Sequence, residues 1–551
     1  MLKEKIMKNI KNIFLILTAF FLATSCNKQI EEKQKDPNDP VSVPSSLILG
    51  SVLTDISGTG TAGRLSATGS TEGVDSWDGA HRWNQYHCSN YDYYDNNIYS
   101  WTNGNFDPYL VLKNVAQMEN EALAIGTPAL NPYEAVGRFA RAYYFYNLTS
   151  MFGDVPLADA LQGVINKTPS YTPQAQVFAY VLNQLDTANS DFAALIAAND
   201  VSLSKSQDIF YAGNLAAWQK LVNSFKLRVL VSVSKHAADL NAPAQFSAIL
   251  SDPARYPIFA GQKDDLKFVY NPGGANIYST YPFNPSNFGS VAARFNMADT
   301  YMKTMVTLND ARVFITTEPA WALVKTDTAN PAQYKYFAGA STGESLATMY
   351  NNANAGLYSF INRYRYYSNF TGDPNSLVGF KEMCFNIAEG ITRGWYSGNA
   401  ETWYKTGITE SMSFYGIDVA KTSFTAYFLP PGNNSVTQVQ PFPFTFDFNT
   451  YYAQPTVQLS ADPATAINQI VLQKYIASFQ NSGYEPYYNW RRTGVPAFEG
   501  GTGVGNNGVV PVRWAYPVTE QTQNGTNWNA ALQAQGFSQD DLNQVMWLIK
   551  N

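Results

Sequence analysis

Charged side chains are scarce in this 551-residue chain: they make up 15% of it, and the formal net charge is −6. Lysine and arginine form no stripe beyond the first residues, which argues against nucleic acid as a partner. The chain has only three histidines, which argues against a histidine-based metal site. Its three cysteines, Cys26, Cys88 and Cys384, are too few for a disulfide framework. Cys88 and Cys384 could pair or remain free thiols.

The sequence motifs of common catalytic sites are also absent. There is no glycine-rich phosphate loop, His-Glu-x-x-His, Cys-x-x-Cys or Gly-x-Ser-x-Gly motif. Paired carboxylates occur at Asp75 and Asp78 and at Asp92 and Asp95, and a retaining glycosidase needs two carboxyl groups about 5–5.5 Å apart. The residues alone therefore leave a surface glycosidase open as an alternative. We predict a binding protein that has no catalytic residues, metal or cofactor.

The first 25 residues have the layout of a secretory signal peptide. Lysines come first, and an apolar core from Ile13 to Leu22 follows that is too short to span a bilayer. The segment Leu22-Ala-Thr-Ser-Cys26 is similar to a lipobox, although its leucine stands one place early. We predict lipidation of Cys26, which would anchor the chain; cleavage near Ser25 without lipidation is the alternative. Residues 26–44 are polar and proline-rich, and we expect a flexible tether.

Aromatic residues, in contrast, are abundant, at 15% of the chain. The densest run extends from Trp77 to Trp101, where rings alternate with Asp, Asn and Gln without a regular period, so we expect mainly loop. Aromatic faces can stack on sugar rings, and short polar side chains can bind hydroxyl groups. We predict a ligand site formed by Trp77, Asp78, Trp83, Asn84, Tyr86, Tyr91, Tyr93 and Asn96, with Tyr278 and Tyr281 closing its far side. The alternative is that many of these rings pack inward.

Helical periodicity dominates much of the chain beyond residue 44. Asn131 can cap a helix, Pro132 suits its first turn, and Gly153 and Pro156 end it, which predicts a helix over 132–151. Both faces of this helix carry apolar or aromatic residues, as is typical of stacked helix pairs. Similar patterns predict helices over 45–54 and 108–123, a helix capped by Thr172, a helix from about Asn214, two helices joined at Ser397-Gly398, and one that Asp462 caps and that ends near Gly483.

The chain carries a series of motifs: Arg141-Ala-Tyr-Tyr-Phe-Tyr-Asn-Leu148, Phe152-Gly-Asp-Val-Pro156, Asn309-Asp-Ala-Arg312 and Asn489-Trp-Arg-Arg-Thr-Gly-Val-Pro496. Together they resemble the SusD/RagB family of outer-membrane nutrient-binding lipoproteins, and most closely its branch with Trp-Arg-Arg-Thr-Gly-x-Pro. This resemblance implies a mostly α-helical fold over 45–551. About four tetratricopeptide-like helix pairs would form a single α-helical superdomain, with long ligand-binding loops and a few short strands.

The resemblance also implies a function. It implies a lipid-anchored protein of the outer membrane, facing the cell exterior, that captures oligosaccharides and delivers them to a SusC-like TonB-dependent transporter. The RagB side of the family implies the alternative, which is capture of peptides for a RagA-like transporter. In the last motif, Arg491 and Arg492 could grip an anionic ligand. We interpret them instead as partners of buried helix carboxylates such as Glu382 or Glu389.

Overall fold

The computed structural model describes residues 7, 42–58, 79–93, 96–271, 281 and 283–551. The chain divides into two compact units, Met1–Pro44 and Ser45–Asn551, and the fold that follows is that of the second unit. Cys26 and most of the predicted leader and tether lie outside the described residues, as do Trp77, Asp78 and Tyr278. In the described part of the chain, no helix combines the length and the hydropathy needed to cross a membrane.

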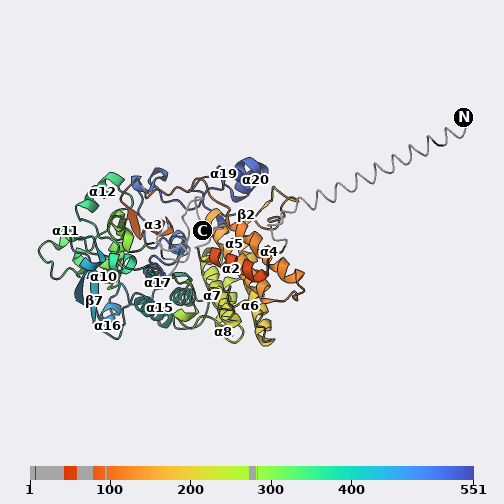
Figure 1. Cartoon of the computed structure of the whole chain (residues 1–551), viewed down its shortest axis with the longest axis horizontal. Coiled ribbons are helices and arrows are strands. Elements are labelled where there is room, and N and C mark those ends of the chain that lie inside the picture. The colour runs from red at the N-terminus through yellow and green to blue at the C-terminus, as the bar shows by residue number, and fades with distance from the viewer. Residues whose placement is uncertain (1–6, 8–41, 59–78, 94–95, 272–280, 282) are drawn as a thin grey trace. The chain divides into compact units, whose positions relative to one another are not determined.

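Long helices fill the N-terminal part of this unit and pack against one another in chain order (Figure 1). They are α2 (Ser45–Ile56), α4 (Pro108–Ala124), α5 (Pro132–Phe152), α6 (Gln174–Ala197), α7 (Leu215–Ser232) and α8 (Ala242–Ser251). α2 packs on α4, α5 on α6 and α7 on α8. A further pair, α14 (Phe380–Thr392) and α15 (Ala400–Phe414), contacts α7 through α14. The prediction of a mostly helical fold is therefore confirmed.

The other described α-helices complete the unit. They are α3 (Gly79–Trp83), α9 (Asp299–Thr307), α10 (Val313–Thr316), α11 (Trp321–Val324), α12 (Leu346–Asn354), α13 (Arg363–Tyr367), α16 (Phe448–Tyr452), α17 (Pro463–Ala477), α18 (Glu485–Thr493), α19 (Val518–Gln523) and α20 (Gly525–Gln535). α17 packs against α14 and α15 and contacts α18. In Figure 1, α10, α11, α12 and α16 gather on the side of the unit away from α4 to α8.

The strands are few and short, as predicted, and those described form antiparallel pairs. The pairs are β1 (His87–Ser89) with β5 (Phe295–Met297), β2 (Val155–Pro156) with β3 (Tyr171–Thr172), β4 (Leu266–Phe268) with β6 (Asn375–Val378), and β7 (Ser423–Phe428) with β8 (Gln440–Thr445). Each pair joins segments of the helical unit, and β1–β5 connects residues about 200 positions apart in sequence.

The boundaries of α5 follow from its sequence. The Asn131 side chain accepts a hydrogen bond from the Glu134 backbone N–H at 3.1 Å, so it caps the helix as predicted. Gly153 ends the helix with a φ of 94°, a left-handed conformation that glycine adopts at little cost. Tyr143, Tyr144 and Tyr146 are all buried, so the helix is covered on more than one face. The prediction of packing on two sides is confirmed.

Other helix ends were predicted with mixed success. Asp462 caps α17 through its side chain, as predicted. α7 starts at the predicted place, and the Asn214 side chain caps it. Thr172 does not cap α6, because it belongs to β3; the Asp154 carboxylate accepts the Gln174 N–H at 2.8 Å instead. α17 ends at Ala477 rather than near Gly483, and Gln480 follows with a φ of 56°, which no continuing helix allows.

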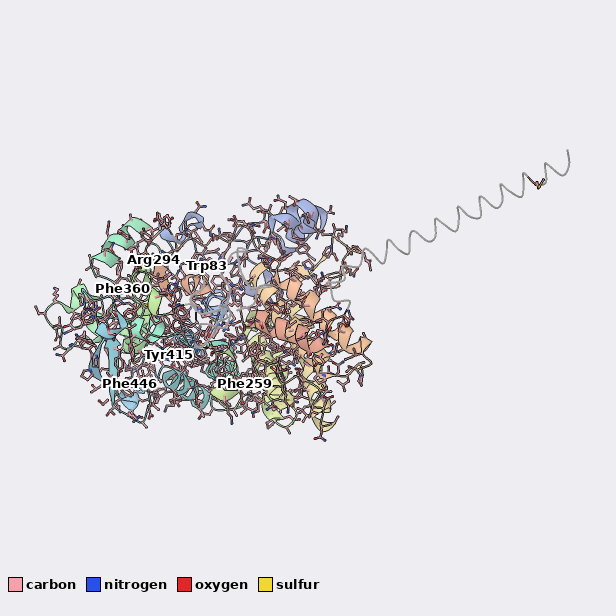
Figure 2. The ribbon with its side chains drawn as sticks, in the orientation of Figure 1. Trp83, Phe259, Arg294, Phe360, Tyr415 and Phe446 are labelled. Carbon is pink, nitrogen blue, oxygen red and sulfur yellow. The ribbon has the colours of Figure 1, made fainter. Side chains whose placement is uncertain are left out.

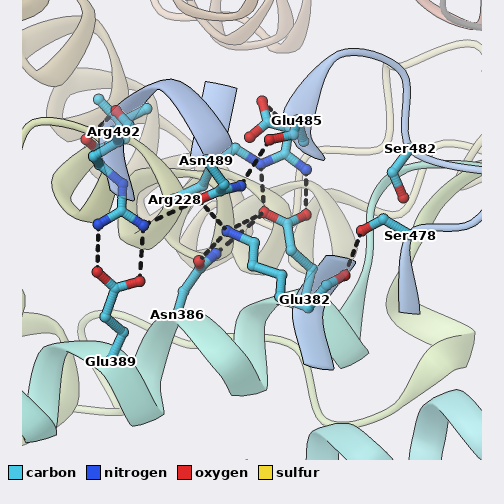
Figure 3. Close-up of polar contacts among 12 residues, drawn as sticks. Arg228, Glu382, Asn386, Glu389, Ser478, Ser482, Glu485, Asn489 and Arg492 are labelled. Atoms are coloured by element: carbon cyan, nitrogen blue, oxygen red, sulfur yellow. Dashed lines mark hydrogen bonds and ion pairs between the residues drawn. The ribbon is translucent and has the colours of Figure 1, made fainter. Parts of the chain in front are cut away.

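A buried network of charges joins α7, α14, α17 and α18 (Figure 3). Arg228 donates to Glu382, and Arg492 donates to Glu389 through two nitrogens. Lys474 donates to the side-chain oxygen of Asn386 at 2.7 Å. The interpretation of Arg492 as the partner of a buried helix carboxylate is therefore confirmed, because charges of opposite sign must meet where water is excluded.

For Arg491 this interpretation is wrong. It donates to the Val512 carbonyl at 2.8 Å and to the Ser150 carbonyl at 2.7 Å, and it forms no ion pair with a carboxylate among the described residues. These two hydrogen bonds thus connect the end of α5 to the C-terminal segment. Cys88 and Cys384 are both free and buried, which resolves the pairing that the sequence left open. Burial raises the pKa of both thiols, so neither is a reactive thiolate.

Candidate functional site

Several predicted ligand residues are buried, and the expectation of an exposed ring or amide is wrong for them. Trp83 is 1% exposed, and its position inside the unit can be followed in Figure 2. Its ring meets the edge of Trp101 at 5.3 Å between centroids and stacks with Tyr484 at 6.3 Å. Packing of this kind places the indole in an aromatic core, where it leaves no face for a ligand.

Asn84 and Tyr86 are also fully buried, and each makes structural hydrogen bonds. The Asn84 amide donates to the Gly483 carbonyl at 2.7 Å and accepts from the Tyr487 N–H at 3.0 Å, so it holds the start of α18. The Tyr86 hydroxyl donates to the Tyr475 carbonyl at 2.6 Å, and the two rings stack at 4.5 Å. These contacts tie the segment around α3 to α17 and α18.

Tyr281, predicted to close the far side of the site, is 1% exposed. Its ring packs edge-on against Tyr270 at 5.0 Å between centroids. Gly372 lies beside the ring: a Cβ added there would come within 2.2 Å of it, and the φ of Gly372 is +50°. Tyr281 therefore fills a space that only glycine leaves open, and it contributes to the core.

The exposed members of the predicted site stand on one loop after β1. Tyr93 is 78% exposed, Tyr91 is 38% exposed, and Asn96 is also exposed. The Asn97 side chain closes this loop: its oxygen accepts the Ser89 N–H at 2.8 Å, and its nitrogen donates to the Ser89 backbone carbonyl at 2.9 Å. Asn97 is itself buried. The two ends of the loop are thus fixed, while Tyr91 and Tyr93 remain accessible.

Two residues from distant segments join these tyrosines. The Tyr91 ring lies 6.5 Å from Tyr93 and 6.1 Å from Tyr350 between centroids. The guanidinium carbon of Arg294 lies 5.7 Å from the Tyr91 ring centroid, within reach of a cation–π contact. Tyr350 is 44% exposed. We call Tyr91, Tyr93, Tyr350 and Arg294 the tyrosine cluster.

Backbone pairing explains why these residues meet. Ser89 pairs with Phe295 in the β1–β5 ladder, and the Asn90 N–H donates to the Arg294 carbonyl at 2.9 Å. Tyr91 and Arg294 therefore stand at the same end of the ladder; Arg294 is labelled in Figure 2. α12 supplies Tyr350, and its neighbour Met349 is buried beside Cys88, so α12 is held against β1. Long-range pairing thus assembles the cluster.

The tyrosine cluster suits binding by stacking and hydrogen bonding. It combines three accessible rings with the Arg294 guanidinium, and the exposed side chains of Asp92 and Asn96 belong to the same loop. Aromatic rings of this kind carry an apolar face and a polar hydroxyl. No group of three His, Cys, Asp or Glu that could hold a metal ion occurs among the described residues. The rings and polar side chains of the tyrosine cluster support capture of a ligand with flat apolar faces and hydroxyl groups.

Sequence reasoning missed Arg294 and Tyr350. Both lie about 200 residues or more from Tyr91, and neither stands in a dense aromatic run. Neither residue stands in a sequence pattern that indicates a binding site. Only the residue types, an arginine and a tyrosine, could have suggested them. Their place in the cluster depends on the β1–β5 pairing and on the packing of α12.

A family model and several solved structures that match this chain all belong to one family. A family model named SusD-like and described as starch-binding associating with outer membrane matches residues 62–517. A solved SusD homologue from Bacteroides fragilis is 28% identical with a TM-score of 0.71; the match covers 93% of this chain and 100% of that one. An outer-membrane protein from Bacteroides vulgatus, described in terms of nutrient binding, is 26% identical with a TM-score of 0.73, over 92% and 100% of the two chains.

A more distant structure shares the fold. It is a chitin-binding SusD homologue from Flavobacterium johnsoniae, 18% identical with a TM-score of 0.66, and the match covers 92% of this chain and 99% of that one. No protein of curated function matches the chain significantly.

Proposed function

Because the chain belongs to the SusD-like family of outer-membrane nutrient-binding proteins, we propose that it captures oligosaccharides at the cell surface. It then delivers them to a SusC-like TonB-dependent transporter. The family consists of binding proteins that are not catalytic. Delivery in this proposal therefore needs no covalent step, and the captured sugar leaves chemically unchanged.

The observation that carries this proposal is the tyrosine cluster. Its rings are exposed at a surface where hydrogen-bonding groups are close by, which is the combination that a sugar ring requires. Tyr93 is the most accessible of the three, so it offers the largest stacking face. The chitin-binding relative makes chito-oligosaccharides a natural first probe, and the family description adds malto-oligosaccharides.

The anchor in this proposal is a lipid on Cys26, followed by the tether over 26–44, which would place the binding unit outside the outer membrane. Mass spectrometry of the N-terminal peptide from the native membrane should find an acylated Cys26. Added protease should cleave the protein on intact cells. An unmodified cysteine in a protein protected from protease would contradict the topology.

Calorimetry of the purified chain against a panel of malto- and chito-oligosaccharides tests the capture step. We expect binding by the wild type and a clear loss in Tyr93→Ala. Tyr364→Ala is the matched control, because Tyr364 is 39% exposed but belongs to a separate stacked pair with Tyr427. Binding of a peptide library without any binding of glycans would replace oligosaccharides with peptides as the cargo.

The delivery step needs the transporter. Co-expression with the SusC-like protein encoded nearest to this chain should allow both to be purified together, and uptake of the bound glycan should fall when the chain is deleted. Uptake that is unchanged by the deletion at low glycan concentration would contradict a role in delivery.

A further inference from the structure

A separate pocket lies beside the hairpin of β7 and β8. Its volume is about 680 Å³, within the range of about 300–1,000 Å³ that is usual for small-molecule sites. It lies between the open end of the hairpin and the 3-10 segment Tyr334–Tyr336 with the loop before it. The residues that matter below are Phe314, Gln333, Tyr334, Ser423, Phe444 and Thr445. We call it the hairpin pocket.

The hairpin pocket has an aromatic wall that the fold holds in place. The register of the hairpin pairs Phe424 with Phe444, and their rings stack at 5.5 Å between centroids. Phe314 is 2% exposed and lies 4.9 Å from Phe444 and 4.7 Å from Tyr334. Tyr334 is only half-buried. It is thus the ring with an accessible face, and Phe314 supports it from behind.

Polar groups that lack partners surround this wall. Within the described residues, the Tyr334 hydroxyl and the hydroxyls of Ser423 and Thr445 make no hydrogen bond. The Gln333 amide nitrogen donates to Asp327 at 2.9 Å and to the Asn330 carbonyl at 2.8 Å, which fixes the side chain. The side-chain oxygen of Gln333, Oε1, has no donor in the described part of the chain and remains available as an acceptor.

The charge of the pocket limits the class of ligand. Among the described residues, Lys335 is the one charged residue that lines it, and the Lys335 ammonium lies 4.7 Å from the Tyr336 ring centroid. An anionic or cationic ligand would find no set of opposite charges there. A supported aromatic face beside hydroxyl and amide groups suits a neutral ring that carries hydroxyl groups.

We propose that the hairpin pocket is a second binding site for a neutral sugar ring, distinct from the tyrosine cluster. This inference rests on the proposed function, since both sites would hold oligosaccharides. The two sites share no lining residue and belong to different segments: the hairpin and the loop before Tyr334 on one side, the loop after β1 and α12 on the other. A chain with two sites can hold one long glycan or two short ones.

The test uses the full chain with maltohexaose and chitohexaose as probes. In Tyr93→Ala, which disables the tyrosine cluster, we expect residual binding, and adding Tyr334→Ala should weaken it by roughly 5- to 150-fold, the loss typical of one stacked ring. Tyr334→Phe and Gln333→Ala provide second variants that keep the aromatic wall, and each should weaken the residual binding in part. Tyr427→Ala, on the same hairpin but outside the pocket, is the control and should change nothing.

The outcomes separate the two proposals. If the wild type binds a probe but Tyr93→Ala retains no binding, or if the Tyr334 and Gln333 variants leave residual binding unchanged, the hairpin pocket is overturned and capture at the tyrosine cluster stands. If the wild type binds neither probe, saccharide capture itself is contradicted, and the pocket proposal fails with it.

Discussion

Arg492 on α18 binds Glu389 on α14 through two guanidinium nitrogens, and both side chains are buried. Arg393 donates to the same carboxylate at 2.9 Å, and Asn489 accepts from Arg492 at 3.0 Å. The carboxylate therefore has two cationic partners, and the arginine has a second acceptor. This contact fastens the C-terminal motif to the helix pair of α14 and α15.

The first prediction concerns the stability that this contact provides. Glu389→Gln should lower the free energy of unfolding by about 3–5 kcal/mol, because it leaves the Arg492 charge buried without its partner. Chemical denaturation followed by circular dichroism measures the change. Asp418→Asn is the control: it removes the exposed pair with Lys421, which should cost less than about 1 kcal/mol. Equal effects of the two variants would contradict a structural role for the buried pair.

The same pair predicts a dependence on pH. Burial by itself raises the pKa of Glu389, but the charges of Arg492 and Arg393 and their hydrogen bonds outweigh it and lower the pKa to about 2. The pKa of a glutamate in the unfolded chain is about 4.3. The folded pKa is the lower one, so this stabilisation is complete above about pH 4.3 and is lost as the pH falls toward 2.

We therefore expect the difference in unfolding free energy between the wild type and Glu389→Gln to shrink as the pH is lowered from about 4.3 toward 2. Denaturation series at several pH values in this window measure the difference. A difference that stays constant across the window would show that Glu389 does not titrate there.

Much of the helical scaffold could be predicted from the sequence, because helix starts depend on neighbouring residues. Asn131, Asn214 and Asp462 each cap a helix through the backbone N–H three positions later, and this spacing is visible in the sequence. The start of α6 could not be predicted in this way. The backbone N–H of its first residue donates to the carboxylate of Asp154, which follows the C-terminal end of α5.

The candidate site was harder to predict for a related reason. Trp83 and Tyr93 stand in the same aromatic run, yet one is 1% exposed and the other 78%. Local composition does not distinguish them, because tertiary contacts set the direction of each ring. Trp83 packs against Trp101 and against Tyr484, which lies far along the chain, whereas Tyr93 stands on the loop that the Asn97–Ser89 contact closes.

The third prediction tests this division of roles. Trp83→Ala should destabilise the fold by about 3–5 kcal/mol, because it leaves a cavity in the aromatic core. Tyr93→Ala should change stability by less than about 0.5 kcal/mol, as an exposed substitution usually does. Melting curves of the two variants give the comparison. A stable Trp83→Ala variant that has lost glycan binding would return Trp83 to the ligand site.

The fourth prediction concerns Tyr350, which the sequence did not suggest. If the tyrosine cluster is the binding surface, Tyr350→Ala should cost roughly 1–3 kcal/mol of glycan binding, similar to other stacked aromatic contacts. Calorimetry with the oligosaccharide that the wild type binds measures it. Leu357→Ala serves as the control, since Leu357 is similarly exposed at 40% and follows α12 without belonging to the cluster. Equal affinity of Tyr350→Ala and the wild type would exclude α12 from the site.

The last prediction concerns the closure of the loop by Asn97. Its side chain bonds both the N–H and the carbonyl of Ser89, and it is 5% exposed, so these bonds are formed away from water. Asn97→Ala should lower the free energy of unfolding by about 1–3 kcal/mol, because two buried backbone groups lose their partner.

Glycan affinity should also fall, since Tyr91 and Tyr93 would no longer be held at fixed positions. Asn96→Ala is the matched control: the Asn96 side chain is exposed on the same loop, so its loss should cost a few tenths of a kcal/mol. Calorimetry and denaturation on both variants separate the two effects. If Asn97→Ala lost stability and kept full affinity, the closure would stabilise the fold without positioning the tyrosines.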